Sequence, residues 1–291
     1  MRPESDVSSA GSLPDFIIIG AMKSGTTTLQ SQLAAQDGVF MSTPKEPNYF
    51  SDDAIFAQGR DWYERLFAGA TPNALKGEAS THYTKLPTYP ETLARMTAVL
   101  PAPKLVYMIR NPMARAVSHY IHEWSLRGAG NDAQTAFRNQ TEFVDYGRYA
   151  MQIAPFIEAY GSERILLTCL EAFKADPEAE FARVAAFLDL PEGTAWQHDL
   201  EAQNVSGQRF RRLPFQSLLV DNTVARALRY ALVPNSVRDK IRARRQITER
   251  PEIPADIDAQ MKIQFLEDRE RLAQFFPGHP ALDLCYPFRS Q

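Results

Sequence analysis

The feature that most constrains this chain is a short apolar run followed by a glycine-bounded loop and a helix. Residues 15–20 (DFIIIG) contain an apolar, isoleucine-rich run, Phe16–Ile19, without alternation, as in the central strand of a parallel sheet. The loop Gly20–Thr28 (GAMKSGTTT) is small and rich in hydroxyls, and Leu29 and Leu33 lie on one face of the helix predicted over residues 26–36. Strand, tight loop and helix in this order open an α/β unit that binds phosphate.

The loop offers several positive groups to an anion. The N-terminus of a helix carries unpaired N–H groups and a partial positive charge. Lys23 adds a full charge, Gly25 lets the backbone approach a ligand, and threonine hydroxyls can donate further hydrogen bonds. We expect the anion to be bound by Lys23, Ser24, Gly25, Thr26, Thr27 and Thr28.

The loop departs from the nucleoside-triphosphate pattern G-x-x-x-x-G-K-[ST]. Gly20 and Gly25 have the correct spacing, but Thr26 stands at the lysine position and the lysine lies inside the loop as Lys23. The later apolar strand ends in Arg110 rather than in an aspartate that could hold Mg²⁺. A shorter, doubly substituted phosphate therefore suits the loop better than a magnesium triphosphate.

The rest of the chain repeats the alternation of strand and helix. Strands are predicted over residues 75–80, 104–110 and 164–170, and helices over residues 90–100, 112–124, 147–160 and 177–188. This alternation predicts a three-layer α/β/α fold with a central parallel sheet and a mostly helical C-terminal third. We expect residues 1–13 to be a disordered tail and residues 14–291 to form a single domain.

Composition excludes several classes of protein. The 291 residues are 44% hydrophobic and 23% charged, which is typical of a globular chain. A net charge of -3 does not indicate nucleic-acid binding. The run Phe16–Ile19 is far short of the about 20 apolar residues that cross a bilayer, and residues 1–13 lack the apolar core of a secretory leader. Cys169 and Cys285 indicate neither a disulfide framework nor a metal cluster, so we expect a cytoplasmic protein without a metal.

A second motif extends the first. In residues 110–120 (RNPMARAVSHY), Arg110 ends a strand and Ser118 follows eight residues later in the next helix. Together with the loop, this segment resembles the nucleotide motifs of sulfotransferases that use 3′-phosphoadenosine 5′-phosphosulfate (PAPS). The resemblance implies a P-loop-like fold in which the loop Gly20–Thr28 binds the 5′-phosphosulfate and Arg110 and Ser118 bind the 3′-phosphate. The product would be adenosine 3′,5′-bisphosphate.

Three further segments indicate a branch of that family. They resemble the heparan sulfate N- and 3-O-sulfotransferases more than the phenol and steroid enzymes: Lys45–Phe50 (KEPNYF), Gly59–Tyr63 (GRDWY) and Gly77–Tyr83 (GEASTHY). The similarity extends roughly from Pro14 to Leu190. One departure is Ala79, where that branch usually has a lysine after the strand-end glutamate. Either Lys85 replaces this lysine or the acceptor is less anionic. Glu78 would orient Lys23 or the acceptor, or form a buried ion pair.

The resemblance also implies chemical roles. Lys23 would stabilise the leaving phosphate and the transferring sulfonate, and Glu46 would be the general base, because the family has its base carboxylate at that position. His82 is the rival base, since the cytosolic branch uses a histidine near the end of the corresponding strand. Arg211 and Arg212 lie in a loose version of the loop that covers the 3′-phosphate in related enzymes.

The sequence thus predicts a metal-independent transfer of a sulfonate from PAPS to a hydroxyl, or an amine, of a sugar, lipid or small metabolite. Two alternatives stay open: a small-molecule kinase that uses ATP and Mg²⁺, and a nucleotide-binding protein without turnover. Residues 209–250 carry 11 Lys or Arg against 3 Asp or Glu. Within them, residues 226–245 predict a solvated helix face, with weak contact to a lipid headgroup surface as the alternative.

Overall fold

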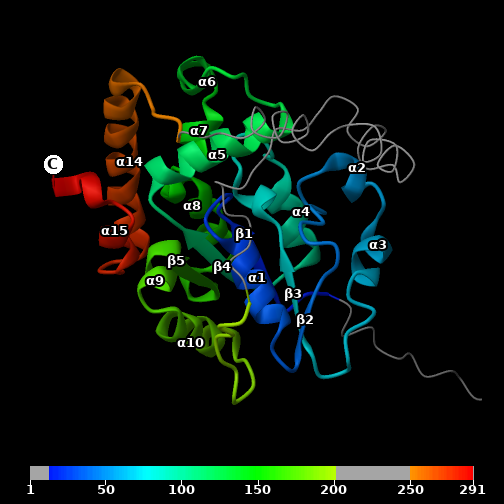
Figure 1. Ribbon diagram of the computed structural model, residues 1–291. Helices are drawn as coiled ribbons and strands as arrows, with labels where there is room; N and C mark the ends of the chain where they lie inside the picture. Colours follow the sequence, from blue (N-terminus) through cyan, green and yellow to red (C-terminus); the bar gives the residue numbers. More distant parts are fainter. Residues whose placement is uncertain (1–12, 201–249, 291) are drawn as a thin grey trace, which may run out of the picture.

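The sheet at the centre of the fold is all-parallel. The computed structural model describes residues 13–200 and 250–290, and in these residues five strands pair in the order β2-β3-β1-β4-β5 (Figure 1). The strands are β1 (Phe16–Gly20), β2 (Val39–Met41), β3 (Leu75–Ala79), β4 (Lys104–Ile109) and β5 (Ile165–Cys169). The central strand β1 pairs with β3 on one side and with β4 on the other, so that Ile17 lies opposite both Glu78 and Leu105.

Helices cover both faces because alternate strand residues point to opposite sides. Phe16 and Ile18 belong to one buried cluster with residues of three helices: α1 (Thr26–Ala34), α9 (Leu170–Ala175) and α10 (Pro177–Leu188). Ile17 and Ile19 belong to the other cluster, which includes residues of α4 (Thr92–Val99), α5 (Pro112–Leu126), α8 (Tyr149–Tyr160), α14 (Ala255–Phe275) and α15 (Ala281–Leu284). The result is the predicted three-layer α/β/α arrangement, with every residue of β1 buried.

Shorter elements complete the described part of the chain. They are α2 (Asp53–Phe56), α3 (Arg60–Arg65), α6 (Ala133–Asn139), α7 (Glu142–Asp145) and the 3₁₀ turns η1 (Thr81–Thr84), η2 (Ser162–Arg164) and η4 (Pro287–Ser290). Side-chain caps start several helices, as the sequence predicts for Asn111, which accepts a hydrogen bond from the Ala114 N–H at 3.1 Å ahead of Pro112 in α5.

The C-terminal helix α14 is attached to the core by a carboxylate. Asp268 accepts hydrogen bonds from the Ala150 and Met151 N–H groups at 2.8 and 3.0 Å, so it satisfies two amides in the first turn of α8. Figure 1 shows α14 beside α8, outside the sheet on the face that also carries α5. In the described residues no helix is long and apolar enough to cross a membrane.

The predicted fold class and the major elements are confirmed. Each predicted strand and helix is present within a few residues of its expected ends, and α8 continues through Pro155. The sequence missed β2, the short helices and α9, which begins directly where β5 ends. Residues 1–12 of the expected tail lie outside the described residues, and the single-domain assignment stays a prediction.

Candidate active site

The loop after β1 is held against β4 and presents the N-terminus of α1. The Ala21 N–H donates to the Met108 carbonyl at 2.7 Å. Gly25 caps α1 with a φ of 97°, so this cap has no side chain that could bind the first helical amides. The Ser24 hydroxyl is buried and has no hydrogen-bond partner among the described residues. The loop thus combines N–H groups, a buried hydroxyl and Lys23 at the carboxyl end of the central strand.

Arg110 joins the two predicted nucleotide motifs. Its Nη1 donates to the Lys23 carbonyl at 3.1 Å, although Lys23 follows β1 and Arg110 follows β4. The Arg110 Nε is buried and has no hydrogen-bond partner within the described ranges. Burial lowers the pKa of Arg110, Tyr149 and Glu171 oppose that shift, and the charge of Arg250 adds to it. Arg250 is thus a second cation near Arg110 that the sequence analysis did not single out.

The helix after Arg110 carries the rest of the second motif. The Tyr149 hydroxyl donates to the Arg110 carbonyl at 2.7 Å and fixes the backbone at this point. Ser118 lies in α5 and is buried. In α1, which follows the loop after β1, Thr26 is buried and Thr27 and Thr28 are half-buried. The predicted phosphate-binding residues therefore follow two adjacent strands at one edge of the sheet.

Glu46 is held near the end of β3. Its N–H donates to the Ala79 carbonyl at 2.9 Å, and its backbone is left-handed with a φ of 55°. Its Oε1 accepts from the Lys45 ammonium at 2.7 Å and from the Thr81 hydroxyl at 3.2 Å. A left-handed conformation is unfavourable for a residue with a Cβ, so the surrounding bonds must hold it.

The charge state of Glu46 follows from its neighbours. Burial raises the pKa of this carboxyl, but the positive charges of Lys45 and Lys85, with His82, outweigh burial and lower it below the usual range. Glu46 is therefore an ionised carboxylate at neutral pH.

His82 lies in η1, close to Glu46. Its ring stacks on Tyr89, with centroids 4.8 Å apart, and its Nδ1 is buried with no hydrogen-bond partner in the described part of the chain. Burial, reinforced by Lys85, lowers the pKa of His82 to about 4. The imidazole is therefore neutral at physiological pH, and both predicted base candidates belong to one cluster.

Lys85 is a buried cation in the same cluster. Only 7% of the residue is exposed, and its ammonium lies 5.7 Å from the centre of the Tyr146 ring. Burial lowers the pKa of Lys85 to about 8, against the opposing charges of Glu46 and Glu123. A buried ammonium with a strongly shifted pKa is costly to keep, which makes Lys85 a candidate functional group of the site.

Among the described residues Glu78 forms no ion pair, which is one of the roles that the sequence left open. Its fully buried carboxyl accepts hydrogen bonds from the Ser80 and Tyr83 hydroxyls, both at 2.6 Å, and from the Tyr63 hydroxyl. Burial raises its pKa, and these hydrogen bonds oppose the shift. Two of the sequence segments, which contain Tyr63 and Tyr83, thus meet on this carboxyl, and Glu78 holds the wall of the site together.

Two buried basic groups of α5 were missed as part of this cluster. Arg115 is fully buried; its Nη2 donates to the Phe143 carbonyl at 2.5 Å, and its Nε and Nη1 have no partner among the described residues. His119 lies 3.7 Å from Glu123, and burial lowers its pKa to about 4. Both lie inside the segment 110–120, but a single sequence gives no signal that they face inward.

Comparison with known proteins identifies the family. The model of the sulfotransferase domain matches residues 13–226. This chain belongs to the sulfotransferase domain family. The match includes both nucleotide motifs, Glu46 and the Glu78 segment, so the predicted resemblance is confirmed. Arg211, Arg212 and the basic residues 226–245 lie outside the described residues.

Curated relatives include the heparan sulfate glucosamine 3-O-sulfotransferase 3B1 of Mus musculus, 32% identical over 197 residues, which are 63% of this chain and 48% of that protein. The bifunctional heparan sulfate N-deacetylase/N-sulfotransferase 1 of Caenorhabditis elegans is 26% identical over 198 residues, which are 62% of this chain and 22% of that protein. The chain therefore spans about half the length of the first relative and 22% of the length of the second. The similar proteins therefore include members of the heparan sulfate sulfotransferase branch, which the three motif segments indicated.

Solved structures agree on the fold. A sulfotransferase from Alicyclobacillus acidocaldarius has a TM-score of 0.65 at 21% identity and covers 93% of this chain and 98% of its own. The sulfotransferase domain from the curacin biosynthetic pathway has a TM-score of 0.51 at 18% identity, covering 90% of this chain and 98% of its own. At these identities the similarity concerns the fold alone.

Proposed function

We propose that this chain transfers a sulfonate from PAPS to an acceptor hydroxyl or amine. The observation that carries the proposal is the hydrogen bond from Arg110 to the Lys23 carbonyl, which brings a loop built for one phosphate against a cation suited to a second. A nucleotide with phosphate groups at both the 5′ and the 3′ positions needs two such anion sites. Ordinary adenine nucleotides lack the 3′-phosphate.

The residues present fit this co-substrate. The unpartnered Arg110 Nε and Ser24 hydroxyl are buried donors that anionic oxygens would satisfy. In this proposal the loop Gly20–Thr28 holds the 5′-phosphosulfate, and Arg110 and Ser118 hold the 3′-phosphate. When bound, PAPS supplies an activated sulfonate, and the bisphosphate leaves carrying the negative charge.

Lys23 and the N-terminus of α1 are proposed to stabilise that charge as it develops. Preorganised cations and N–H groups accelerate reactions where charge develops in the transition state. Glu46 is proposed to accept the proton of the acceptor hydroxyl as its oxygen bonds to sulfur. The neighbouring cations keep Glu46 ionised at neutral pH, so that it is ready to accept a proton.

His82 is the weaker candidate for the base. A neutral imidazole can accept a proton, but stacking on Tyr89 and a pKa of about 4 make this ring a poor acceptor. We propose that it shapes the acceptor side of the cluster. Lys85 is proposed to contact the sulfonate or an anionic group of the acceptor. It would thereby replace the lysine that the family branch usually has at the position of Ala79.

A sugar is the acceptor class that we propose, since the curated relatives are named for heparan sulfate glucosamine. Lipids and small metabolites are the other classes to screen. Incubating the protein with sulfur-labelled PAPS and acceptor panels from each class would identify the acceptor. No labelled product with any panel, despite tight bisphosphate binding, would favour a binding protein without turnover.

Calorimetry separates this proposal from a kinase. We expect adenosine 3′,5′-bisphosphate to bind without Mg²⁺, and Arg110→Ala to weaken it by about 10-fold or more, as for loss of a hydrogen bond to a charged group. Arg65→Ala, on the exposed end of α3, is the matched control and should bind normally. Tight binding of ATP with Mg²⁺, and none of the bisphosphate, would contradict the proposal.

A further inference from the structure

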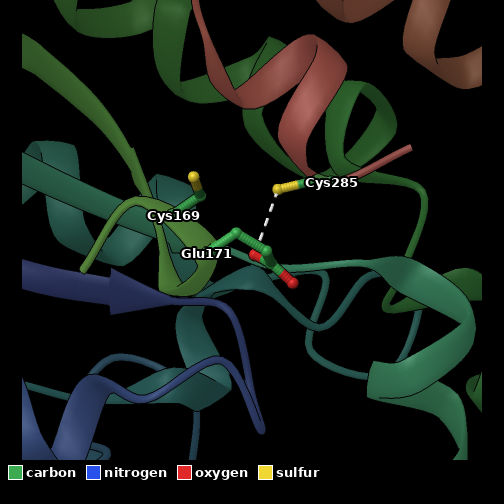
Figure 2. A group of neighbouring side chains, drawn as sticks. All are labelled: Cys169, Glu171 and Cys285. Carbon is green, nitrogen blue, oxygen red and sulfur yellow. Dashed lines mark hydrogen bonds between the residues drawn. The ribbon is translucent and has the colours of Figure 1, made fainter. Parts of the chain in front are cut away.

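The two cysteines of the chain come together with a carboxylate at the carboxyl end of β5 (Figure 2). Cys169 is the last residue of β5, Glu171 lies in the first turn of α9, and Cys285 directly follows α15. One potential ligand atom of each lies within 4.8 Å of the other two. Only the fold brings these residues together, which is why their sequence spacing gave no sign of a shared site.

The cluster is enclosed and its carboxylate is oriented. Cys169 and Cys285 are 1% and 0% exposed. The Asn111 N–H donates to Glu171 Oε1 at 2.9 Å. The Cys285 thiol donates to Glu171 Oε2 at 3.4 Å, the bond that is dashed in Figure 2. A backbone hydrogen bond to one carboxylate oxygen is the kind of outer contact that orients a metal ligand and leaves the other oxygen directed at the thiol.

The charges around the cluster favour a cation. Two thiolates and a carboxylate together would carry three negative charges, which a divalent ion would reduce to one. Arg110 directly precedes Asn111, whose N–H contacts Glu171, and it interacts electrostatically with Glu171, so its guanidinium can compensate the remaining charge.

We propose that Cys169, Glu171 and Cys285 bind Zn²⁺, with water as a fourth ligand. Zn–S bonds of about 2.3 Å and Zn–O bonds of about 2.1 Å in a tetrahedron separate sulfur from oxygen by about 3.6 Å and sulfur from sulfur by about 3.8 Å. The 3.4 Å between Cys285 Sγ and Glu171 Oε2 already fits this geometry. The three ligand atoms lie at most 4.8 Å apart, so side-chain movements of about 1 Å would bring them to these distances.

The ligand set selects the metal and its role. Two thiolates favour Zn²⁺ over the hard cations Mg²⁺ and Ca²⁺. The ion would join β5 and α9 to the segment after α15. Its ligand Glu171 also accepts from the N–H of Asn111, the residue that follows Arg110. The ion would thus link these elements beside the nucleotide motif, with no part in the transfer step proposed above.

Cobalt titration of the full-length, fully reduced protein tests the site. The chain has 2 cysteines, so a thiolate-to-cobalt absorption band can come from this cluster alone. We expect the band to saturate at one Co²⁺ per chain, to disappear when Zn²⁺ is added, and to develop with release of about two protons from the thiols at neutral pH. Reduced protein that gives no such band would overturn the proposal. The same holds if the cysteines are isolated as a disulfide and the protein binds no metal after reduction.

Variants assign the ligands. Cys285→Ser should abolish the band, and Glu171→Gln, which keeps both thiols, should weaken Co²⁺ binding by about 10-fold or more. His198→Ala is the control, because His198 is exposed and forms a surface pair with Glu178 at 2.8 Å. A band of equal strength in Cys285→Ser, or loss of the band in His198→Ala, would contradict the assignment. If Cys285→Ser fails to fold, the wild-type and Glu171→Gln titrations still decide.

Discussion

Glu46 and His82 are the two side chains whose roles can be separated by substitution. Glu46→Gln keeps the shape of the side chain but removes the proton acceptor, so we expect turnover to fall by about 10²–10⁴-fold while adenosine 3′,5′-bisphosphate binds as before. His82→Gln should lower turnover by less than about 10-fold. Rates with labelled PAPS and calorimetry with the bisphosphate measure both effects; the opposite ranking of the two variants would make His82 the base.

Lys85 makes a prediction about alkaline pH. Its pKa is about 8, so it is charged below that pH and neutral above it. If its charge assists transfer, kcat/KM declines as pH rises through about 8, and Lys85→Met removes this decline and lowers the rate below pH 8. Lys104→Met, which removes a partner of Asp189 at the start of β4, the end of the strand away from the site, should keep the wild-type profile. A decline that persists in Lys85→Met would assign it to another group.

What the sequence predicted at the residue scale depends on how local the signal is. Lys23 and Arg110 follow directly after apolar strands, so their place at the edge of the sheet could be predicted from neighbouring residues. Lys85 was named only as a replacement for Ala79, and neither Arg115 nor His119 was predicted to join this buried cluster. Their burial depends on which side of α5 faces the Phe143 and Tyr146 rings, and those contacts come from a distant helix segment.

Among the elements, the turn into α1 depends on a glycine. Gly25 has a φ of 97°, and a Cβ there would lie 3.0 Å from Leu170 Cδ1 and Met108 Cε. Gly25→Ala should destabilise the protein by at least about 1 kcal/mol and weaken bisphosphate binding, because the backbone would shift at the anion site. Thermal unfolding and calorimetry measure the two effects.

Gly193→Ala is the matched control for this turn. Gly193 has a similar φ of 87°, but a Cβ there meets nothing within 4 Å. Gly193→Ala should therefore lower the stability of the protein, because alanine disfavours a positive φ, but should leave the affinity for the bisphosphate unchanged. If both glycine variants bind the bisphosphate as the wild type does, the loop is not the anion site.

The elements that were predicted differ from those that were missed in their length and in whether capping residues or prolines mark their ends. β1 and β4 are continuous apolar runs, and α5 and α10 begin with a capping residue and a proline, which are local signals. β2 has three residues at the edge of the sheet and no pattern of its own. α9 begins at Leu170 with no loop after β5, so its first residue fell within the predicted strand.

For the molecule as a whole, strand order explains why distant motifs meet. The chain leaves β1 towards β2 and β3, and then crosses to β4 on the other side. The loops after β1 and β4 therefore leave neighbouring strand ends in opposite directions, which is where open parallel sheets bind ligands. The sequence motifs predicted this pairing only through the family resemblance, because strand order is set by packing across the whole sheet.

Stability in acid is a property of the whole molecule that the buried histidines should control. The pKa of His119 is about 4 in the folded protein, below its ordinary value of 6.5, because its ring is buried against Phe143 and Tyr146. Protons therefore bind the unfolded chain more readily, and the stability present above pH 6.5 is lost as pH falls from 6.5 towards 4.

Replacing His119 should flatten this acid decline. His119→Gln removes the titrating group, so we expect its free energy of unfolding to fall less than that of the wild type between pH 6.5 and 4, by up to about 3 kcal/mol. Urea unfolding at a series of pH values measures the two slopes. His198→Gln, at an exposed site, should follow the wild-type slope. Parallel curves for His119→Gln and the wild type would mean that other groups cause the loss in acid.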